Sequence, residues 1–207
     1  MNIYISIDGV LRNFINRFHY HYENAYINVD EVEDNFEYKV TEPICNLNLS
    51  DHFTFQSKEQ AEYFQYVEYP MELYGHSPVS YNNVYNEFNK FIYDYKEHNV
   101  FLVGLDEFGK SKAATLFFLS KSGFMPNNIK FILSEDLEKE WEIADAWISD
   151  SKKILETKPE NKEFILFQTV YNEFFTYDKK INKLSDIIID EKNLISITDE
   201  NQKQLDA

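Results

Sequence analysis

The sequence predicts an α/β fold in which a mainly parallel sheet is flanked by helices. Three observations lead to this prediction. Short apolar runs typical of buried strands recur along the chain, helical patterns separate several of them, and polar or glycine-containing stretches follow the runs. Strands that alternate with helices form βαβ units, in which successive strands lie parallel.

The first expected strand covers residues 3–7, a β-branched and aromatic run that ends before Gly9. Further runs of the same kind predict strands at residues 99–105, 128–134, 145–149 and 164–168. The chain beyond residue 186 predicts one last strand or hairpin.

Helices are expected between these runs. Residues 82–98 carry apolar side chains at three- and four-residue spacing, which indicates an amphipathic helix. Residues 111–124 predict a second helix that is closed by Gly123. A third helical pattern covers residues 57–69, after the possible N-cap Ser57.

Residues 11–82 differ in composition from the rest of the chain, because they are rich in Tyr, Asn and acidic residues. This stretch is too long for an ordinary loop and predicts an inserted, mainly helical cap subdomain. The core domain is then expected at residues 1–10 and 83–190. Residues 191–207 are expected to form a polar C-terminal tail.

Composition and charge limit the possible partners. The chain has 207 residues, of which 43% are hydrophobic and 17% aromatic, so we expect a globular protein. Its formal net charge of -16 opposes binding to nucleic acid and to anionic membrane surfaces. The single Cys45 allows no internal disulfide, and the N-terminus lacks signal-peptide features, so we expect a cytoplasmic location.

Polar stretches follow the expected strands at residues 6–9, 104–111, 134–139 and 149–153. In a parallel sheet, ligands bind beyond the carboxyl ends of the strands. We therefore expect these stretches to converge on one site.

In order and spacing, these stretches resemble the haloacid dehalogenase (HAD) superfamily, and within it the 5'(3')-deoxyribonucleotidase-like phosphatases, several of which occur in phage genomes. The segments that carry the resemblance are IYISIDGVLRNF (3–14), YVEYPMELYGHSP (66–78), VFLVGLDEFGKSKAATLFFLSKSGF (100–124), EKEWEIADAWISDSKKILETKP (138–159) and FILFQTVYNEFF (164–175). The resemblance covers residues 3 to about 188 and implies a HAD-type sheet with an inserted cap.

The resemblance also implies a role for each motif position. An aspartate nucleophile is expected where this chain has Ser6, and Asp8 stands at the position of the general acid and base. Gly104 occupies the position of a serine or threonine that binds the phosphoryl group. Lys139 matches the phosphate-binding lysine.

The family's Mg²⁺ site is implied to retain Asp8 and Asp150, while Ser149 replaces an expected carboxylate. Because Mg²⁺ depends on oxygen ligands with negative charge, the resemblance implies a weak or absent Mg²⁺ site. Asp106 and Glu107 are alternative ligands from the second motif.

Other roles are open for the same residues. Asp8 could cap a turn, Asp150 could be a helix N-cap, and Lys139 could be an ordinary exposed helix lysine. His76 and Gly75 could line a pocket or form a turn. The cap aromatics could stack on a base, form the subdomain's own core, or present a protein interface; they are Tyr63, Phe64, Tyr66, Tyr69 and Tyr74.

The departures from the family motifs predict a catalytically inactive relative of a nucleotidase, retained as a binding or structural module and recruited into a phage virion. Its expected partners are other proteins of an assembly or a small phosphorylated ligand. Its location would be the host cytoplasm or the virion. The alternatives are an active Mg²⁺-dependent phosphatase that hydrolyses deoxynucleoside monophosphates at a rearranged site, and a nucleotide sensor without turnover.

Overall fold

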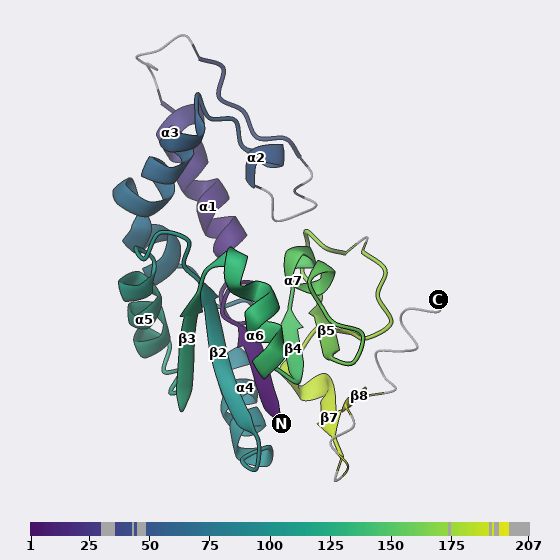
Figure 1. The fold of residues 1–207 in the computed structure, drawn as a ribbon. Coiled ribbons are helices and arrows are strands. Elements are labelled where there is room, and N and C mark those ends of the chain that lie inside the picture. Colours follow the sequence, from purple (N-terminus) through teal and green to yellow (C-terminus); the bar gives the residue numbers. More distant parts are fainter. Residues whose placement is uncertain are drawn as a thin grey trace.

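The computed structural model describes residues 1–29, 36–42, 44, 49–173, 175–190, 192 and 195–198. These residues form a six-stranded parallel sheet with the strand order β3-β2-β1-β4-β5-β6, flanked by helices (Figure 1). The strands are β1 Asn2–Ser6, β2 Asn99–Leu105, β3 Asn128–Ile132, β4 Ala146–Ser149, β5 Glu163–Phe167 and β6 Lys180–Ile181. The predicted α/β class with a mainly parallel sheet is confirmed.

Strand β1 lies at the centre of the sheet, where Ser6 pairs with Val103 of β2 and Ile5 pairs with Ile148 of β4. The chain builds β1, β2 and β3 outward in one direction, and then returns to add β4 on the other side of β1. This reversal creates a topological switch point between β1 and β4, which is where parallel α/β sheets bind ligands.

The helices are α1 Phe14–Tyr22, α2 Leu49–His52, α3 Lys58–Tyr63, α4 Val84–Asp94, α5 Lys112–Lys121, α6 Leu137–Ile143 and α7 Lys152–Glu156. π-helical turns occupy Glu23–Ile27, Phe64–Glu68 and Met71–Gly75, and 3-10 turns occupy Ser134–Asp136 and Leu184–Asp186. Helices α4 and α5 confirm the two helices predicted on either side of β2. The predicted helix at residues 57–69 is found as α3 followed by a π-helical turn.

Alternation along the strands gives the sheet two different faces. On one face, Ile3 and Ile5 pack with Phe88 of α4 and Phe118 of α5. On the other face, Tyr4 joins an aromatic cluster that includes two buried tryptophans. They are Trp141 of α6 and Trp147 of β4. Both faces of the sheet are therefore covered, as a parallel sheet requires.

The segment from residue 11 to 82 contains α1, α2 and α3 and lies over the carboxyl ends of the strands (Figure 1). It has an aromatic cluster of its own, in which Phe18, Tyr22 and Phe64 are almost fully buried. The same cluster includes Ala114 of α5 and Tyr171, which follows β5. The segment is thus packed against the sheet and its flanking elements through a shared apolar core.

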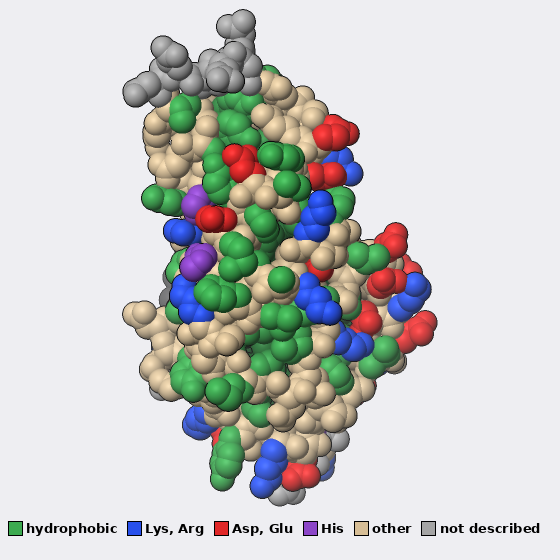
Figure 2. All heavy atoms as spheres, turned by 90° about the vertical axis from the view of Figure 1, so that its left-hand side faces the viewer, with side chains coloured by type: hydrophobic (Ala, Val, Ile, Leu, Met, Phe, Trp, Pro, Cys, Tyr) green, Lys and Arg blue, Asp and Glu red, His purple; other side chains and the backbone are tan. Residues whose placement is uncertain are grey.

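Figure 2 shows the face formed by α5 and the helices of the 11–82 segment, where apolar side chains reach the surface. The large exposed apolar side chains of α3, of the π-helical turns Phe64–Glu68 and Met71–Gly75, and of α5 are Tyr63, Val67, Met71, Leu116 and Phe117. Apolar patches of this kind mark contact surfaces in many proteins. Tyr63 therefore belongs to the surface and not to the cluster inside the segment.

Strands β7 (Ile187–Ile189) and β8 (Ile195–Ile197) form an antiparallel hairpin, which confirms the expected C-terminal hairpin. The predicted start of the tail at residue 191 is wrong, because β8 lies beyond it and packs with Ile187 against the core. Residues 199–207 of that tail, and Cys45, lie outside the described residues. Along the described parts of the chain, no helix is both long and apolar enough to cross a membrane.

Candidate ligand-binding crevice at the carboxyl end of the sheet

A cavity of about 670 Å³ opens at the switch point, and we call it the inner cavity. Ser6 and Asp8 line it from the end of β1, and Ser149 and Asp150 line it from the end of β4. The polar stretches after β2 and β3 contribute as well, through Glu107 and Ser134 of the same lining. The expected convergence of the four stretches is confirmed.

Ser6 is almost buried, with an exposed fraction of 7%. Its hydroxyl donates a hydrogen bond to Ser149 Oγ at 2.8 Å and accepts one from Trp147 Nε1 at 3.2 Å. The backbone N–H of Ser151 donates to the same Ser149 oxygen at 3.2 Å. Within the described part of the chain, the Ser6 hydroxyl therefore bonds to another hydroxyl and to an indole N–H, and neither of these groups is a base that could activate it as a nucleophile.

We expect Ser6→Ala to lower the free energy of unfolding by about 1–2 kcal/mol, because it leaves the buried Trp147 indole N–H without an acceptor. Urea unfolding measures the change. Ser120→Ala, at an exposed position of α5, is the control and should change stability by less than about 0.5 kcal/mol. Equal effects of the two variants would contradict a structural role for the Ser6 hydroxyl.

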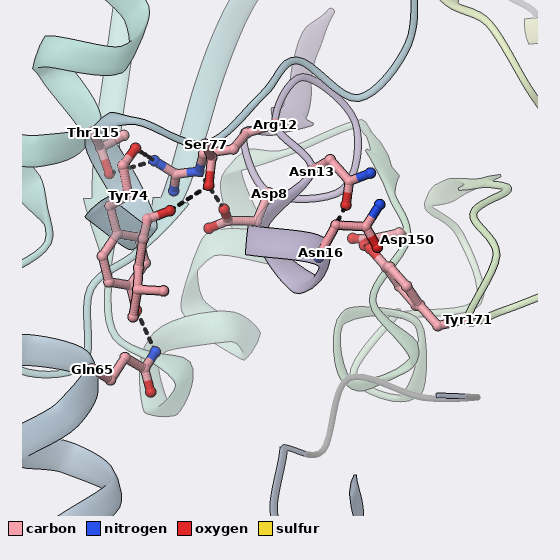
Figure 3. Close-up of polar contacts among 11 residues, drawn as sticks. Asp8, Arg12, Asn13, Asn16, Gln65, Tyr74, Ser77, Thr115, Asp150 and Tyr171 are labelled. Carbon is pink, nitrogen blue, oxygen red and sulfur yellow. Dashed lines mark hydrogen bonds and ion pairs between the residues drawn. The ribbon is translucent and has the colours of Figure 1, made fainter. Parts of the chain in front are cut away.

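Asp8 forms an ion pair with Arg12, whose Nε lies 2.6 Å from Asp8 Oδ1 (Figure 3). Arg12 is 1% exposed, and its Nη1 donates to the Tyr74 carbonyl at 2.6 Å and to Thr115 Oγ1 at 3.1 Å. The guanidinium also lies over the rings of Tyr74 and Phe118. Asp8 is therefore the counter-ion of a buried cation that connects β1, the 11–82 segment and α5.

Asp150 is 4% exposed, and the Tyr171 hydroxyl donates a hydrogen bond to its Oδ2 (Figure 3). The pKa of Asp150 is raised to about 7, mainly by burial and also by the charge of Asp8, while the hydrogen bond from Tyr171 opposes the shift. Gly9 packs against this carboxyl group, since a Cβ on Gly9 would lie 1.9 Å from Asp150 Oδ2. The N-cap of α7 is Ser151 and not Asp150.

These contacts make a poor set of magnesium ligands. Asp8 is engaged by a guanidinium, Asp150 is held by a phenol at a position that favours its neutral form, and Ser149 offers only a hydroxyl. Among the described residues, no group of three or more His, Cys, Asp or Glu side chains could hold a metal ion. The residues therefore do not fit the implied Mg²⁺ site.

The two alternative Mg²⁺ ligands from the loop after β2, Asp106 and Glu107, make hydrogen bonds that hold this loop in place. Asp106 Oδ1 accepts hydrogen bonds from the backbone N–H and the hydroxyl of Ser111 at 3.0 and 2.8 Å. The Glu107 carboxylate accepts from the backbone N–H of Ser134 at 3.2 Å and from its hydroxyl. These bonds fix the β2–α5 loop against the start of α6.

The structure does not bring Lys139 or Gly104 to the inner cavity. The Lys139 side chain is 76% exposed on α6 and forms an ion pair with Asp136 at 2.6 Å, as expected of an ordinary surface lysine. Gly104 faces Phe131 and Ile7, whereas Val103 and Leu105 line the cavity. Alternation along β2 thus points Gly104 to the other side of the sheet.

A second cavity, of about 1110 Å³, adjoins the inner cavity, and we call it the outer cavity. Tyr66 and Glu107 line both cavities, and the rings of Tyr66 and Phe108 meet at a centroid distance of 4.7 Å. Phe18, Phe53 and other rings of the 11–82 segment form much of the outer wall. Gly75 and His76 do not line either cavity, which favours the turn over the pocket.

Sequence reasoning missed the residues that engage Asp8 and Asp150. Arg12 follows an apolar stretch, and a lone cation in such a setting indicates a buried, paired charge. Tyr171 carried no local signal, because its partner Asp150 lies 21 positions earlier. Only the fold brings the two together.

A scan against protein-family models finds no family that matches the chain, and a search of curated proteins finds no relative. The resemblance to the HAD superfamily therefore stays a prediction. It rests on the order and spacing of the sequence stretches.

Proposed function

We propose that the chain is a catalytically inactive relative of the HAD nucleotidases, in which residues 11–82 are the inserted cap and the whole is a binding or structural module of a phage assembly. The observation that carries the proposal is the hydrogen bond from Ser6 to Ser149 at the end of the central strand. The parallel sheet and the helical segment over its carboxyl end are consistent with this ancestry.

Phosphoryl transfer at this site would need a nucleophile and a proton donor. A carboxylate nucleophile would form an acyl phosphate, which hydrolyses readily, whereas a serine needs an adjacent base before it can attack. The hydroxyl of Ser6 donates to Ser149, which is not a base, and Asp8 neutralises Arg12. Both steps of the family reaction therefore lack their reacting group.

The charges around the inner cavity also oppose a phosphate ester. Lys152 and Lys153 line the cavity, and Lys152 pairs with Glu156 at 3.3 Å. Asp51 and Glu107 face the same space. A partner protein is thus a better candidate than a phosphorylated ligand, and the exposed apolar face of α5 is consistent with such a partner.

A phosphatase assay tests the proposal. Purified protein is incubated with Mg²⁺ and either an aryl phosphate or a panel of deoxynucleoside monophosphates, with Asp8→Asn measured in parallel as the control for contaminating enzyme. We expect no turnover that differs between the two proteins. Mg²⁺-dependent turnover that Asp8→Asn abolishes would overturn the proposal and establish the rearranged phosphatase in its place.

A further inference from the structure

We propose that the inner cavity binds a small organic cation that carries an aromatic or apolar body. The inference rests on the proposed function, because it assigns to the same site a ligand that is not a phosphate ester. Three features of the cavity support it: its charges, its aromatic wall and its size.

Acidic side chains outnumber lysines around the inner cavity. Asp8 is paired with Arg12, and Glu156 with Lys152; outside these two ion pairs, the acids of the lining are Asp51, Glu107 and Asp150, and the lysine is Lys153. Arg12 is the guanidinium next to Asp8, but it is 1% exposed and directed at the Tyr74 carbonyl and Thr115, so it cannot receive an anion. A cleft lined by one sign of charge concentrates ions of the opposite sign, here cations.

Aromatic rings form a continuous row along one side of the cavity. Phe14 stacks on Tyr74 at a centroid distance of 5.0 Å, and Tyr74 stacks on Tyr66 at 6.0 Å. Phe14 and Tyr66 are only partly buried and line the cavity on either side of Tyr74. Such rings attract organic cations through their faces and pack against apolar bodies.

The size of the inner cavity suits a small molecule, because its volume of about 670 Å³ lies within the range of roughly 300–1,000 Å³ that is typical of such sites. Glu107 is exposed and lines the cavity together with Tyr66. A ligand that lies along the ring row can therefore place its ammonium or guanidinium group near Glu107 and its body against Phe14 and Tyr66.

Tryptamine and indole-3-propionate provide a matched pair of probes, since both carry an indole on a short chain but with opposite charge. Isothermal titration calorimetry at pH 8 and low salt should give an affinity at least tenfold higher for tryptamine. Added NaCl should weaken tryptamine binding, because part of the attraction is electrostatic. Equal or tighter binding of indole-3-propionate would overturn the inference.

Two single-residue variants test whether tryptamine binds in the inner cavity. Glu107→Gln keeps an acceptor for Ser134 but removes one charge from the cavity, and it should weaken tryptamine binding at least threefold. Glu160→Gln removes an exposed charge that does not line the cavity, so its affinity should equal that of the parent protein. Equal affinities of the two variants would place tryptamine elsewhere and overturn the assignment, provided that both unfold at the parent temperature.

Two further arms separate the possible failures. One arm uses a capped tetrapeptide that contains Trp and Lys and so carries a similar ring and charge on a peptide backbone. Binding of this peptide without binding of tryptamine would overturn the proposal that the ligand is a small molecule. The phosphatase assay on the same preparation reports on the proposed function independently. If the protein shows neither turnover nor tryptamine binding, the result contradicts only the proposed binding of an organic cation. Turnover that depends on Asp8 would instead contradict the proposed function.

Discussion

Replacement of Arg12 by methionine should lower the free energy of unfolding by about 3–5 kcal/mol, the cost of removing one partner from a buried ion pair. Methionine fills similar space but cannot donate hydrogen bonds. The change leaves the Tyr74 carbonyl and Thr115 Oγ1 without their donor, and it leaves Asp8 without its counter-ion. Denaturant unfolding of the parent and the variant measures the difference.

Arg17→Met is the matched control, because it makes the same chemical change within α1. Arg17 is only partly buried; its Nε donates to the Glu72 carbonyl at 3.3 Å, and its guanidinium lies over the ring of Tyr20. Its replacement should cost less than about 1 kcal/mol. A loss for Arg12→Met no larger than that of Arg17→Met would show that the ion pair does not hold the 11–82 segment to the core.

The double variant Asp8→Asn/Arg12→Met extends the test. Because the two side chains interact directly, we expect the double variant to lose less stability than the sum of the two single variants, by about 0.5–3 kcal/mol. Simple additivity would mean that the two groups act independently.

Asp150→Asn should stabilise the protein at alkaline pH, by an amount on the order of 4 kcal/mol at pH 8, because the folded pKa is raised from 3.8 to about 7. Asparagine has a similar shape and still offers an oxygen to the Tyr171 hydroxyl, but it carries no charge to bury. Thermal unfolding of parent and variant between pH 4 and 8 measures the effect.

The direction of the pH dependence follows from the raised pKa. Between about pH 4 and pH 7, folded Asp150 holds a proton that the unfolded chain has released, so this contribution to stability falls as pH rises. It is fully present below the unfolded pKa and lost once the pH passes the folded pKa. The variant lacks this slope, so its advantage should be close to zero at pH 4 and largest at pH 8.

Asp178→Asn serves as the control for a general loss of negative charge, because Asp178 is exposed. It should change the stability by less than about 0.5 kcal/mol at either pH. An advantage of Asp150→Asn that stays constant from pH 4 to pH 8 would contradict a buried, titrating carboxyl group at this position.

The sheet could be predicted from the sequence because strands β1, β4 and β5 are buried on both faces and therefore read as apolar runs. Residues 99–105 match β2 in full, and the other four predicted runs overlap β1, β3, β4 and β5. Strand β6 escaped prediction because its two residues, Lys180 and Ile181, show no pattern. It pairs with β5 through long-range contacts that no local signal reports.

The sequence predicts where the site lies in the fold, but not which residues bind its side chains. The ends of β1 and β4 meet as the alternation of strands and helices requires, so Ser6, Asp8, Ser149 and Asp150 were found together. Their partners could not be read from the motifs. Arg12 and Tyr171 act through hydrogen bonds across the fold, and Lys139 was assigned by spacing although its helix turns it toward solvent.

The central position of β1 affects how the chain can be made. This strand is synthesised first, but it pairs with residues 99–103 and 146–148. At synthesis rates of roughly 5–20 residues per second, on the order of 10 s pass before β2 is available to cover it. During that time an apolar strand with two open edges is exposed, and such edges template aggregation. Folding of the sheet therefore depends on slow, long-range pairing of its first strand.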